Sequence, residues 1–293
     1  MHKRLWNVLK LEFELQPKAP LLIKAGASTT SPNPSLPDMQ FVRTATPKGE
    51  TVFIPGSSLK GVFRGFTEKV LRTVDRACDP FSMEACGRRL SDEEDTAKIY
   101  RESCRACKIY GHTRLRGRLS FTDAFPTGAV KTETRYGVAI SRLTNAVAVG
   151  PFEMEVLVAG TFSGSLVLEN FEVWQLGLLA LTLQALNEGM VKVGFGKNRG
   201  LGEVHLQVKR AVLEMARKNG IAPSELWGVG AFVDEDEEER SRYGLRRDDR
   251  LTDLPVVEQK DLGILLRREY TEEAWRKVAE KAIASLAVGE AGS

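Results

Sequence analysis

The four cysteines of the chain all lie between Cys78 and Cys107. Cys104 and Cys107 form a C-x-x-C pair, a spacing that lets two thiolates bind one tetrahedral Zn²⁺. Cys78 and Cys86 are spaced more widely, as C-x7-C, and His112 is an alternative ligand. Disulfides are not expected in a reducing cytoplasm, so the thiols either bind a metal or are buried and inert. We predict a structural zinc site, since four protein ligands leave no open coordination position.

Residues 54–64, IPGSSLKGVFR, have the composition of an anion-binding helix start. Ser57 or Ser58 is expected to cap the helix, and Lys60 and Arg64 lie one turn apart on its polar face. Free N–H groups at the start of a helix attract phosphate, so this segment predicts an anion site. An ordinary amphipathic helix with a solvated basic face is the alternative.

Residues 194–202, GFGKNRGLG, form the second candidate anion site. Glycines permit positive φ and let backbone N–H groups approach an anion closely, and Lys197 and Arg199 add charge. A nucleotide-binding P-loop is excluded, because Lys197 is followed by Asn198 instead of Ser or Thr and the next element is a strand. A glycine-rich hairpin with incidental basic residues remains the alternative.

The periodicity of apolar residues predicts the elements that position these segments. Alternation indicates extended structure at residues 11–15, 118–124, 155–169 and 204–208. The third of these segments is expected to break at Gly160 and Gly164. Spacings of three and four indicate helices at residues 59–74 and 171–188, the second ending at Gly189. Their order is strand, helix, strand, strand, helix, strand, which predicts an α+β fold with a ferredoxin-like (β-α-β-β-α-β) core.

The remaining segments are predicted to be additions to a core at residues 1–210. Residues 75–117 hold every cysteine without sustained periodicity and are expected to form an insertion. Residues 211–293 are expected to be a C-terminal extension. It contains an acidic run at residues 234–239, which favours a solvated, mobile loop, and a terminal helix at residues 271–286.

The 293 residues carry a formal charge of only +3, so any binding of nucleic acid has to depend on local basic clusters. One such cluster is in residues 101–118, which contain six Lys and Arg residues against one Glu. The amino terminus lacks the continuous apolar segment of an export signal, and the most apolar stretch, residues 171–190, is interrupted by polar residues. We expect a cytoplasmic protein with no membrane association.

The two anion-binding segments together resemble the P-G-S-S-L-K-G motif and the terminal glycine-rich loop of the RAMP superfamily, found in type III CRISPR effector complexes. The resemblance covers residues 5–208, because the matching elements occur in the family's order. It implies an RRM-like core and subunits that stack along a CRISPR guide RNA. Phosphate contacts would fix register on the guide without reading its sequence. The implied guide contacts are Ser57, Ser58, Lys60, Arg64, Lys197, Asn198 and Arg199.

Residues 38–43, DMQFVR, follow a loop at residues 25–37 and resemble the catalytic loop of the family's cutting subunits. The resemblance makes Asp38 the catalytic candidate and Arg43 an RNA contact. An aspartate beside a phosphodiester could hold Mg²⁺ or another divalent cation, or orient a 2′-hydroxyl for attack. A turn role for Asp38 after Pro37 is the alternative.

Residues 134–150 resemble the family's segment leading into a thumb hairpin, which we place at about residues 125–165. Tyr136 is expected to stack on a base and Arg135 and Arg142 to pair with phosphate, although a surface turn and strand would explain the segment equally well. Zinc-dependent folding of the insertion would present the basic run at residues 101–118 to RNA, with Arg114 and Arg116 as contacts.

The resemblance therefore predicts a type III CRISPR subunit that binds guide RNA and cleaves complementary target RNA. Its cysteine-rich insertion resembles a type III-D-associated branch. The implied partners are guide RNA, target RNA, other RAMP subunits and the large polymerase/cyclase-like subunit. Two alternatives remain open. One is a structural subunit that does not cut, and the other is a guide-processing endoribonuclease, which would usually act through His, Tyr or Lys.

Overall fold

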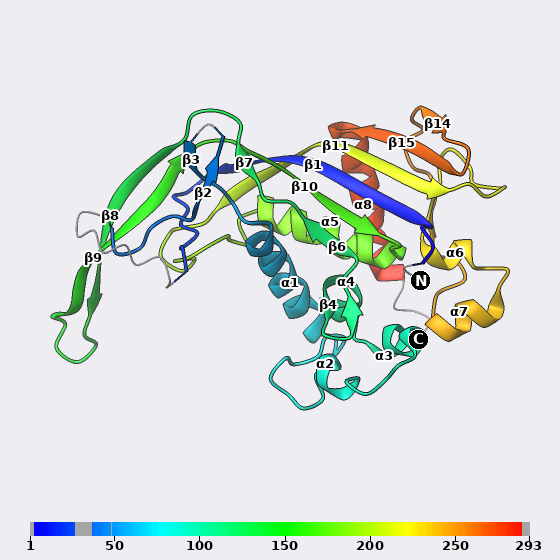
Figure 1. The fold of residues 1–293 in the computed structure, drawn as a ribbon, viewed down its shortest axis with the longest axis horizontal. Coiled ribbons are helices and arrows are strands. Elements are labelled where there is room, and N and C mark those ends of the chain that lie inside the picture. The colour runs from blue at the N-terminus through cyan, green and yellow to red at the C-terminus, as the bar shows by residue number, and fades with distance from the viewer. Residues whose placement is uncertain (1–2, 27–36, 48, 289–293) are drawn as a thin grey trace.

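The computed structural model describes residues 3–26, 37–47 and 49–288, and its centre is an antiparallel sheet. The strand order is β14-β15-β11-β1-β10-β6, with β7 paired to β10. Helices α1, α5 and α8 lie on one side of this sheet (Figure 1). The helices are α1 Gly56–Arg72, α5 Val173–Asn187 and α8 Glu272–Val288. The strands are β1 Asn7–Pro17, β6 Leu119–Phe121, β7 Phe125–Pro126, β10 Phe162–Glu169, β11 Val204–Ala216, β14 Gln259–Asp261 and β15 Leu265–Thr271.

The alternating residues of β1 build the core. Leu9, Leu11, Phe13 and Leu15 are buried, whereas Lys10 between them faces solvent. β1 pairs with β10 on one side and with β11 on the other, so it is central in the sheet. The antiparallel sheet and the mixture of helices and strands confirm the α and β content that the sequence predicts.

β11 is longer than the predicted strand and continues past residue 210. A bulge opposite Glu12 and Phe13 leaves Lys209 and Arg210 both exposed, which interrupts the alternation in the sequence. β15 pairs with residues 210–216 of β11. Helix α8 packs so closely on α5 that a Cβ added to Gly177 would lie 2.5 Å from the carbonyl oxygen of Ala282. Part of the predicted extension therefore belongs to the central sheet and core.

Asp249 connects this C-terminal part to the start of α5. Its two carboxylate oxygens accept hydrogen bonds from the N–H groups of Val173 (2.8 Å) and Gly230 (2.9 Å). Burial, followed by the nearby charge of Glu172, raises the pKa of Asp249 to about 7. The short elements around it are β12 Leu226–Trp227, α6 Val229–Phe232 and β13 Arg250–Leu251.

The predicted insertion forms a group of short elements beneath α1 (Figure 1). They are α2 Cys86–Arg89, α3 Thr96–Glu102, α4 Arg105–Tyr110, β4 Gly111–His112 and β5 Leu115–Arg116. Its apolar residues, among them Leu90 and Ile99, form a second buried cluster with Val229 and Tyr243. The insertion is thus packed against the C-terminal part of the chain.

The acidic run at residues 234–239 leads into a helix. Helix α7, Glu237–Tyr243, begins inside it, and the Asp236 carboxylate caps it by accepting the N–H of Glu239 at 2.9 Å. The prediction of a loop is therefore wrong for residues 237–239, whereas residues 234–236 form a turn and residues 235–238 are exposed. Acidic side chains are favourable in the first turn of a helix, where the N–H groups are unpaired.

Two hairpins complete the fold. Strands β8 Lys131–Ile140 and β9 Val147–Ala159 form a long hairpin that projects from one end of the sheet, and β2 Arg43–Thr46 pairs with β3 Gly49–Val52 (Figure 1). Gly160, with a φ of +148°, separates β9 from β10. The predicted break at Gly164 is wrong, because this residue lies inside β10, where a Cβ would be 2.9 Å from the Phe13 ring. Residues 27–36 of the predicted loop lie outside the described residues.

Candidate nucleic-acid interface and metal centre

A groove of about 500 Å³ lies between α1 and the glycine-rich segment 194–202. Gly61, Gly65 and Lys69 line it from α1, where the spacing of four places them on one face of the helix. The opposite wall comes from residues 190–200 and carries Lys192 and Lys197. The groove therefore takes Gly61 and Val62 from the first predicted segment and Lys197, Asn198 and Gly200 from the second, while none of the predicted contacts of the first segment lines it.

The groove is basic and no acidic residue lines it among the described residues. Burial, followed by the positive charge of Lys69, lowers the pKa of Lys197. Lys69, Lys192 and Lys197 form no side-chain hydrogen bond or ion pair with any residue that the structure describes. Three lysines that line one groove, with Lys69 and Lys197 close enough for their charges to repel, are suited to binding a polyanion.

The glycines around the groove fall into two groups. A Cβ added to Gly61, Gly65 or Gly200 would meet nothing within 4 Å, so packing within the protein does not require these glycines. A Cβ on Gly194 would instead lie 2.3 Å from the carbonyl oxygen of Leu22, and Gly194 has a φ of +81°. Gly194 shapes the loop, and Gly200 does so as well through its φ of +77°, whereas Gly61 and Gly65 leave an open surface that a ligand backbone can approach closely.

The glycine-rich segment is fixed to the chain that follows β1. The N–H of Phe195 donates to Leu22 O at 2.7 Å, and the N–H of Gly202 donates to Pro20 O at 2.9 Å. The N–H of Arg199 donates to Gly196 O at 2.7 Å, which closes a turn. Lys197, Asn198 and Arg199 are therefore exposed at the tip of an anchored loop.

The start of α1 differs from the prediction. Pro55 is the N-cap residue, and no side chain caps the helix. The N–H of Gly56 donates to the Asp123 carboxylate at 2.8 Å, which places a negative charge where a phosphate was expected. Capping by Ser57 or Ser58 is therefore wrong, although Ser57 is exposed and Ser58 is half-buried.

Lys60 and Arg64 lie on a different row of α1 from the groove glycines. Arg64 Nε donates to Glu68 at 2.7 Å, and its Nη1 donates to Gly111 O in the insertion at 3.2 Å. Burial, followed by the charge of Arg64, lowers the pKa of Lys60. Sequence reasoning missed Lys69 and Lys192 as groove residues. The spacing from Gly61 to Lys69 is visible in the sequence, but only the packing shows which row faces the groove.

Asp38 and Arg43 lie near the base of the long hairpin. Asp38 is exposed, and its Oδ2 accepts the N–H of Glu153 in β9 at 2.9 Å. Arg43 forms an ion pair with Glu155, whose other carboxylate oxygen accepts the N–H of Phe41 at 3.0 Å. The hairpin strand thus holds the segment that carries both residues.

The candidate contacts on the hairpin are exposed. Tyr136 has 69% of its surface exposed, and Arg142 lies beyond the end of β8 near the hairpin turn. Arg135 is also exposed and donates to Glu133 on the same strand at 2.8 Å. None of these three side chains lines the groove.

The basic run at residues 101–118 is divided between the interior and the surface. Arg118 is buried with its guanidinium 4.2 Å from the Tyr100 ring centroid, and Arg105 lies 5.4 Å from the Trp174 ring centroid. Arg114 and Arg116 are exposed, and Arg114 donates to Glu93 O at 2.8 Å. The expectation that the whole run faces RNA is therefore wrong, because part of it packs against aromatic rings.

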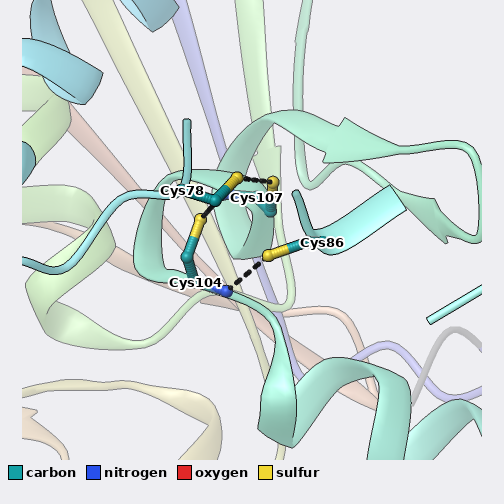
Figure 2. A group of neighbouring side chains, drawn as sticks. All are labelled: Cys78, Cys86, Cys104 and Cys107. Carbon is teal, nitrogen blue, oxygen red and sulfur yellow. Dashed lines mark hydrogen bonds between the residues drawn. The ribbon is translucent and has the colours of Figure 1, made fainter. Parts of the chain in front are cut away.

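The four cysteines converge on one point (Figure 2). Their Sγ atoms all lie within 4.8 Å of one another, and Cys78 Sγ is 3.8 Å from Cys107 Sγ and 3.7 Å from Cys104 Sγ. Disulfide sulfurs would be about 2 Å apart. Backbone N–H groups of Cys104 and Cys107 donate to the sulfurs of Cys86 (3.2 Å) and Cys104 (3.4 Å). The group could hold a metal ion.

The contacts within the cluster favour Cys104 as a thiolate over Cys86. The contact with Cys107, followed by that with Cys86, lowers the pKa of Cys104 well below its usual range. The contact with Cys104 raises the pKa of Cys86 to about 11. A bound cation would be needed to hold all four as thiolates. His112 lies outside this group: its Nε2 is 2.9 Å from Ser103 Oγ, and its Nδ1 accepts the N–H of Arg114 at 3.3 Å.

The family-model comparison gives the class of protein to which this fold and site belong. The model of the RAMP superfamily matches residues 14–205, so the chain belongs to the RAMP superfamily. Membership implies a CRISPR-associated RNA-binding subunit. No curated protein matches the chain. Among the described residues, no helix combines the length and the apolar character that a membrane span requires.

Proposed function

We propose that this chain is a backbone subunit of a type III CRISPR RNA-guided effector complex and binds the guide RNA backbone in the groove between α1 and residues 194–202. The observation that carries the proposal is the groove itself. Lys69, Lys192 and Lys197 line it, none of the described residues that line it is acidic, and Gly61 and Gly65 leave its α1 wall open. A phosphodiester chain supplies the negative charge and the narrow backbone that such a surface accommodates.

The strand order supports the finer assignment of the fold. In chain order the core elements are β1, α1, β6, β10, α5 and β11, and in the sheet the four strands lie in the order β11-β1-β10-β6. This is the sequence of elements of a ferredoxin-like, RRM-like core. The projecting β8–β9 hairpin, residues 131–159, lies within the range of about residues 125–165 expected for the thumb-like segment.

The test is the salt dependence of RNA binding. Each phosphate contact on single-stranded nucleic acid contributes about 0.7 to the slope of log affinity against log salt concentration. Changing Lys69, Lys192 and Lys197 together to glutamine should reduce the slope by about 2, measured by fluorescence polarisation with single-stranded RNA. The control changes Lys209, Lys260 and Lys277, which lie outside the groove, and should leave binding nearly unchanged. Equal losses in both triple variants would refute the groove as the binding site.

The identity of the bound RNA has its own test. RNA that co-purifies with the assembled complex and survives nuclease treatment should be of uniform length and carry CRISPR repeat sequence. RNA fragments of random sequence would still be consistent with an RNA-binding groove, but they would contradict the assignment of the bound RNA as a guide. The expected neighbours in the complex are other RAMP subunits and the large polymerase/cyclase-like subunit.

We assign zinc to the four-cysteine group. Zn–S bonds of about 2.3 Å in a tetrahedron place the sulfurs about 3.8 Å apart. The distances from Cys78 Sγ to Cys107 Sγ and Cys104 Sγ, 3.8 and 3.7 Å, agree with this geometry. All four positions are taken by protein, so the role is structural and the ion would hold the loop and two helices that carry the cysteines.

Cleavage of complementary target RNA at Asp38 is the second part of the proposal. Asp38 is exposed, and the Glu153 N–H orients its carboxylate through Oδ2. A divalent cation such as Mg²⁺ would be held by this carboxylate together with RNA phosphates, because Mg²⁺ often binds through one or two carboxylates and substrate oxygens. A non-catalytic subunit of the same complex is the alternative, and an assay of the assembled complex with Asp38→Ala decides between them.

A further inference from the structure

Helix α1 carries two neighbouring rows of residues with different partners. Gly61, Gly65 and Lys69 line the groove. In the next row, Glu68 accepts hydrogen bonds from Arg64 Nε at 2.7 Å and from Arg72 Nη2 at 2.9 Å. The three side chains form a continuous chain of ion pairs along the helix, and none of them lines the groove.

Both ends of this ion-pair row reach the cysteine-bearing insertion. Arg72 donates to the carbonyl oxygen of Cys78, a metal-ligand candidate, from Nε at 3.4 Å and from Nη2 at 3.3 Å. Arg64 donates from Nη1 to Gly111 O at 3.2 Å. Gly111 is the C-cap residue of α4, the helix that begins at the C-x-x-C pair.

A buried hydrogen bond to α4, made by a residue that lies between Arg64 and Arg72 along α1, strengthens this attachment. Thr67 of α1 shares a hydrogen bond of 2.9 Å with the hydroxyl of Tyr110, the last residue of α4. Although burial acts to lower it, the ion pair with Glu68 raises the pKa of Arg64. The charge of Arg64 is therefore stabilised by its own helix.

Helices α2, α3 and α4 have 4, 7 and 6 residues, and helices this short depend on packing or on ligands for their stability. The insertion is packed through its own buried cluster, and the end of α4 is held in the main core by Ile109 and Tyr110. Cys78 is only partly buried. Loss of a metal from the cysteines would therefore free Cys78 and loosen the start of α4, and the carbonyl oxygen that holds Arg72 would be placed less firmly.

We propose that Arg64, Glu68 and Arg72 are positioning residues that couple metal binding at the four cysteines to RNA binding in the groove, an inference that rests on the proposed RNA-binding function. The bound metal fixes Cys78 O and the start of α4, Cys78 O holds Arg72 at one end of the ion-pair row, and the row sets the placement of the groove face of α1. Coupling between two binding sites is reciprocal, so RNA must tighten metal binding by the factor by which metal tightens RNA binding.

The experiment measures both affinities in the full chain. RNA affinity is determined by fluorescence polarisation with zinc-loaded and chelated protein, and zinc affinity by competition with a chromophoric chelator with and without single-stranded RNA. For the wild-type chain we expect zinc to increase RNA affinity about tenfold and RNA to increase zinc affinity by the same coupling factor, within the usual range for coupled sites. If the chelated protein unfolds, the ratio of zinc affinities with and without RNA still gives this coupling factor.

Glu68→Gln is the decisive variant, and Glu102→Gln is its matched control. Glu102 also pairs with two arginines, Arg89 (3.5 Å) and Arg101 (3.9 Å), but these ion pairs stay within the insertion. Glu68→Gln removes a negative charge near the groove, so simple electrostatics predicts tighter RNA binding. We expect instead that the coupling factor between zinc and RNA falls below about 2 in Glu68→Gln while this variant retains one zinc per chain. Glu102→Gln should keep the wild-type coupling factor.

Three results would overturn the inference. The first is an undiminished factor in Glu68→Gln, and the second is equal loss in the Glu102→Gln control. The third is wild-type protein whose RNA affinity is independent of zinc although binding still depends on the groove lysines. That third result leaves the proposed function standing, whereas zinc-loaded protein that fails to bind RNA refutes the proposed function as well.

Discussion

Alanine at Gly61 and Gly65 should change stability and RNA binding in opposite directions. A Cβ at either position meets nothing within 4 Å, so alanine fits without rearrangement. Glycine in a helix interior costs about 1 kcal/mol relative to alanine, and the double variant should gain about 2 kcal/mol in the free energy of unfolding. At about 2 °C per kcal/mol for a chain of this size, the melting temperature should rise by about 4 °C.

RNA binding should weaken in the same variant. Methyl groups placed between α1 and a closely approaching phosphodiester chain overfill the contact at a cost of about 1–3 kcal/mol. This corresponds to a loss of at least about fivefold in affinity. Urea denaturation and fluorescence polarisation on the same preparations measure the two effects. Gly128→Ala is the control, because its Cβ also meets nothing but lies outside the groove.

The outcomes separate two steps of the reasoning. Unchanged RNA affinity with increased stability would show that the open glycine row is not where RNA approaches. Decreased stability would contradict the geometry of the helix itself.

Other predictions concern the metal site, the catalytic candidate and the buried carboxylate. Cys104→Ser should abolish the binding of one zinc per chain, measured by atomic absorption, whereas His112→Ala should retain it because the ring nitrogens of His112 bond elsewhere. Asp38→Ala should stop target-RNA cleavage by the assembled complex without weakening RNA binding, and full cleavage would assign the cut to another residue. The raised pKa of Asp249, about 7 against 3.8, means that the folded state holds its proton more tightly, so this group's contribution to stability falls as pH rises from about 4 to about 7. Asp249→Asn should remove this pH dependence, which amounts to at most about 4 kcal/mol in the free energy of unfolding between about pH 4 and pH 7, measured by urea denaturation.

The sequence predicts those elements whose pattern depends on one buried face. β1 alternates because its neighbours on both sides are strands and only one face of the sheet is covered. α5 was found from its apolar content and the glycine after it. The continuation of β11 was missed, because the bulge at Lys209 shifts the alternation by one residue and the register depends on a partner strand far away in the chain.

The cysteines were recognised as a metal-ligand group although their spacing is irregular, because each of them is in the same insertion. Their packing could not be foreseen. Arg118 and Lys108 are basic residues in a segment whose composition is typical of a protein surface. Both nevertheless face the ring of Tyr100, and Lys108 Nζ lies 5.0 Å from the ring centroid. A cation beside an aromatic ring leaves no periodic signal in the sequence.

The composition of α1 is explained by the division of its faces. Glycines at residues 61 and 65 weaken the helix, by about 1 kcal/mol each, where no tertiary contact compensates. The buried row, which includes Leu59, Phe63 and Leu71, anchors the helix to the core, and the row of ion pairs anchors it to the insertion. With two rows held by the protein, the third can be left bare for a ligand. The insertion is therefore part of the physical basis for an open binding face, and a helix with only its apolar anchor would place that face less firmly.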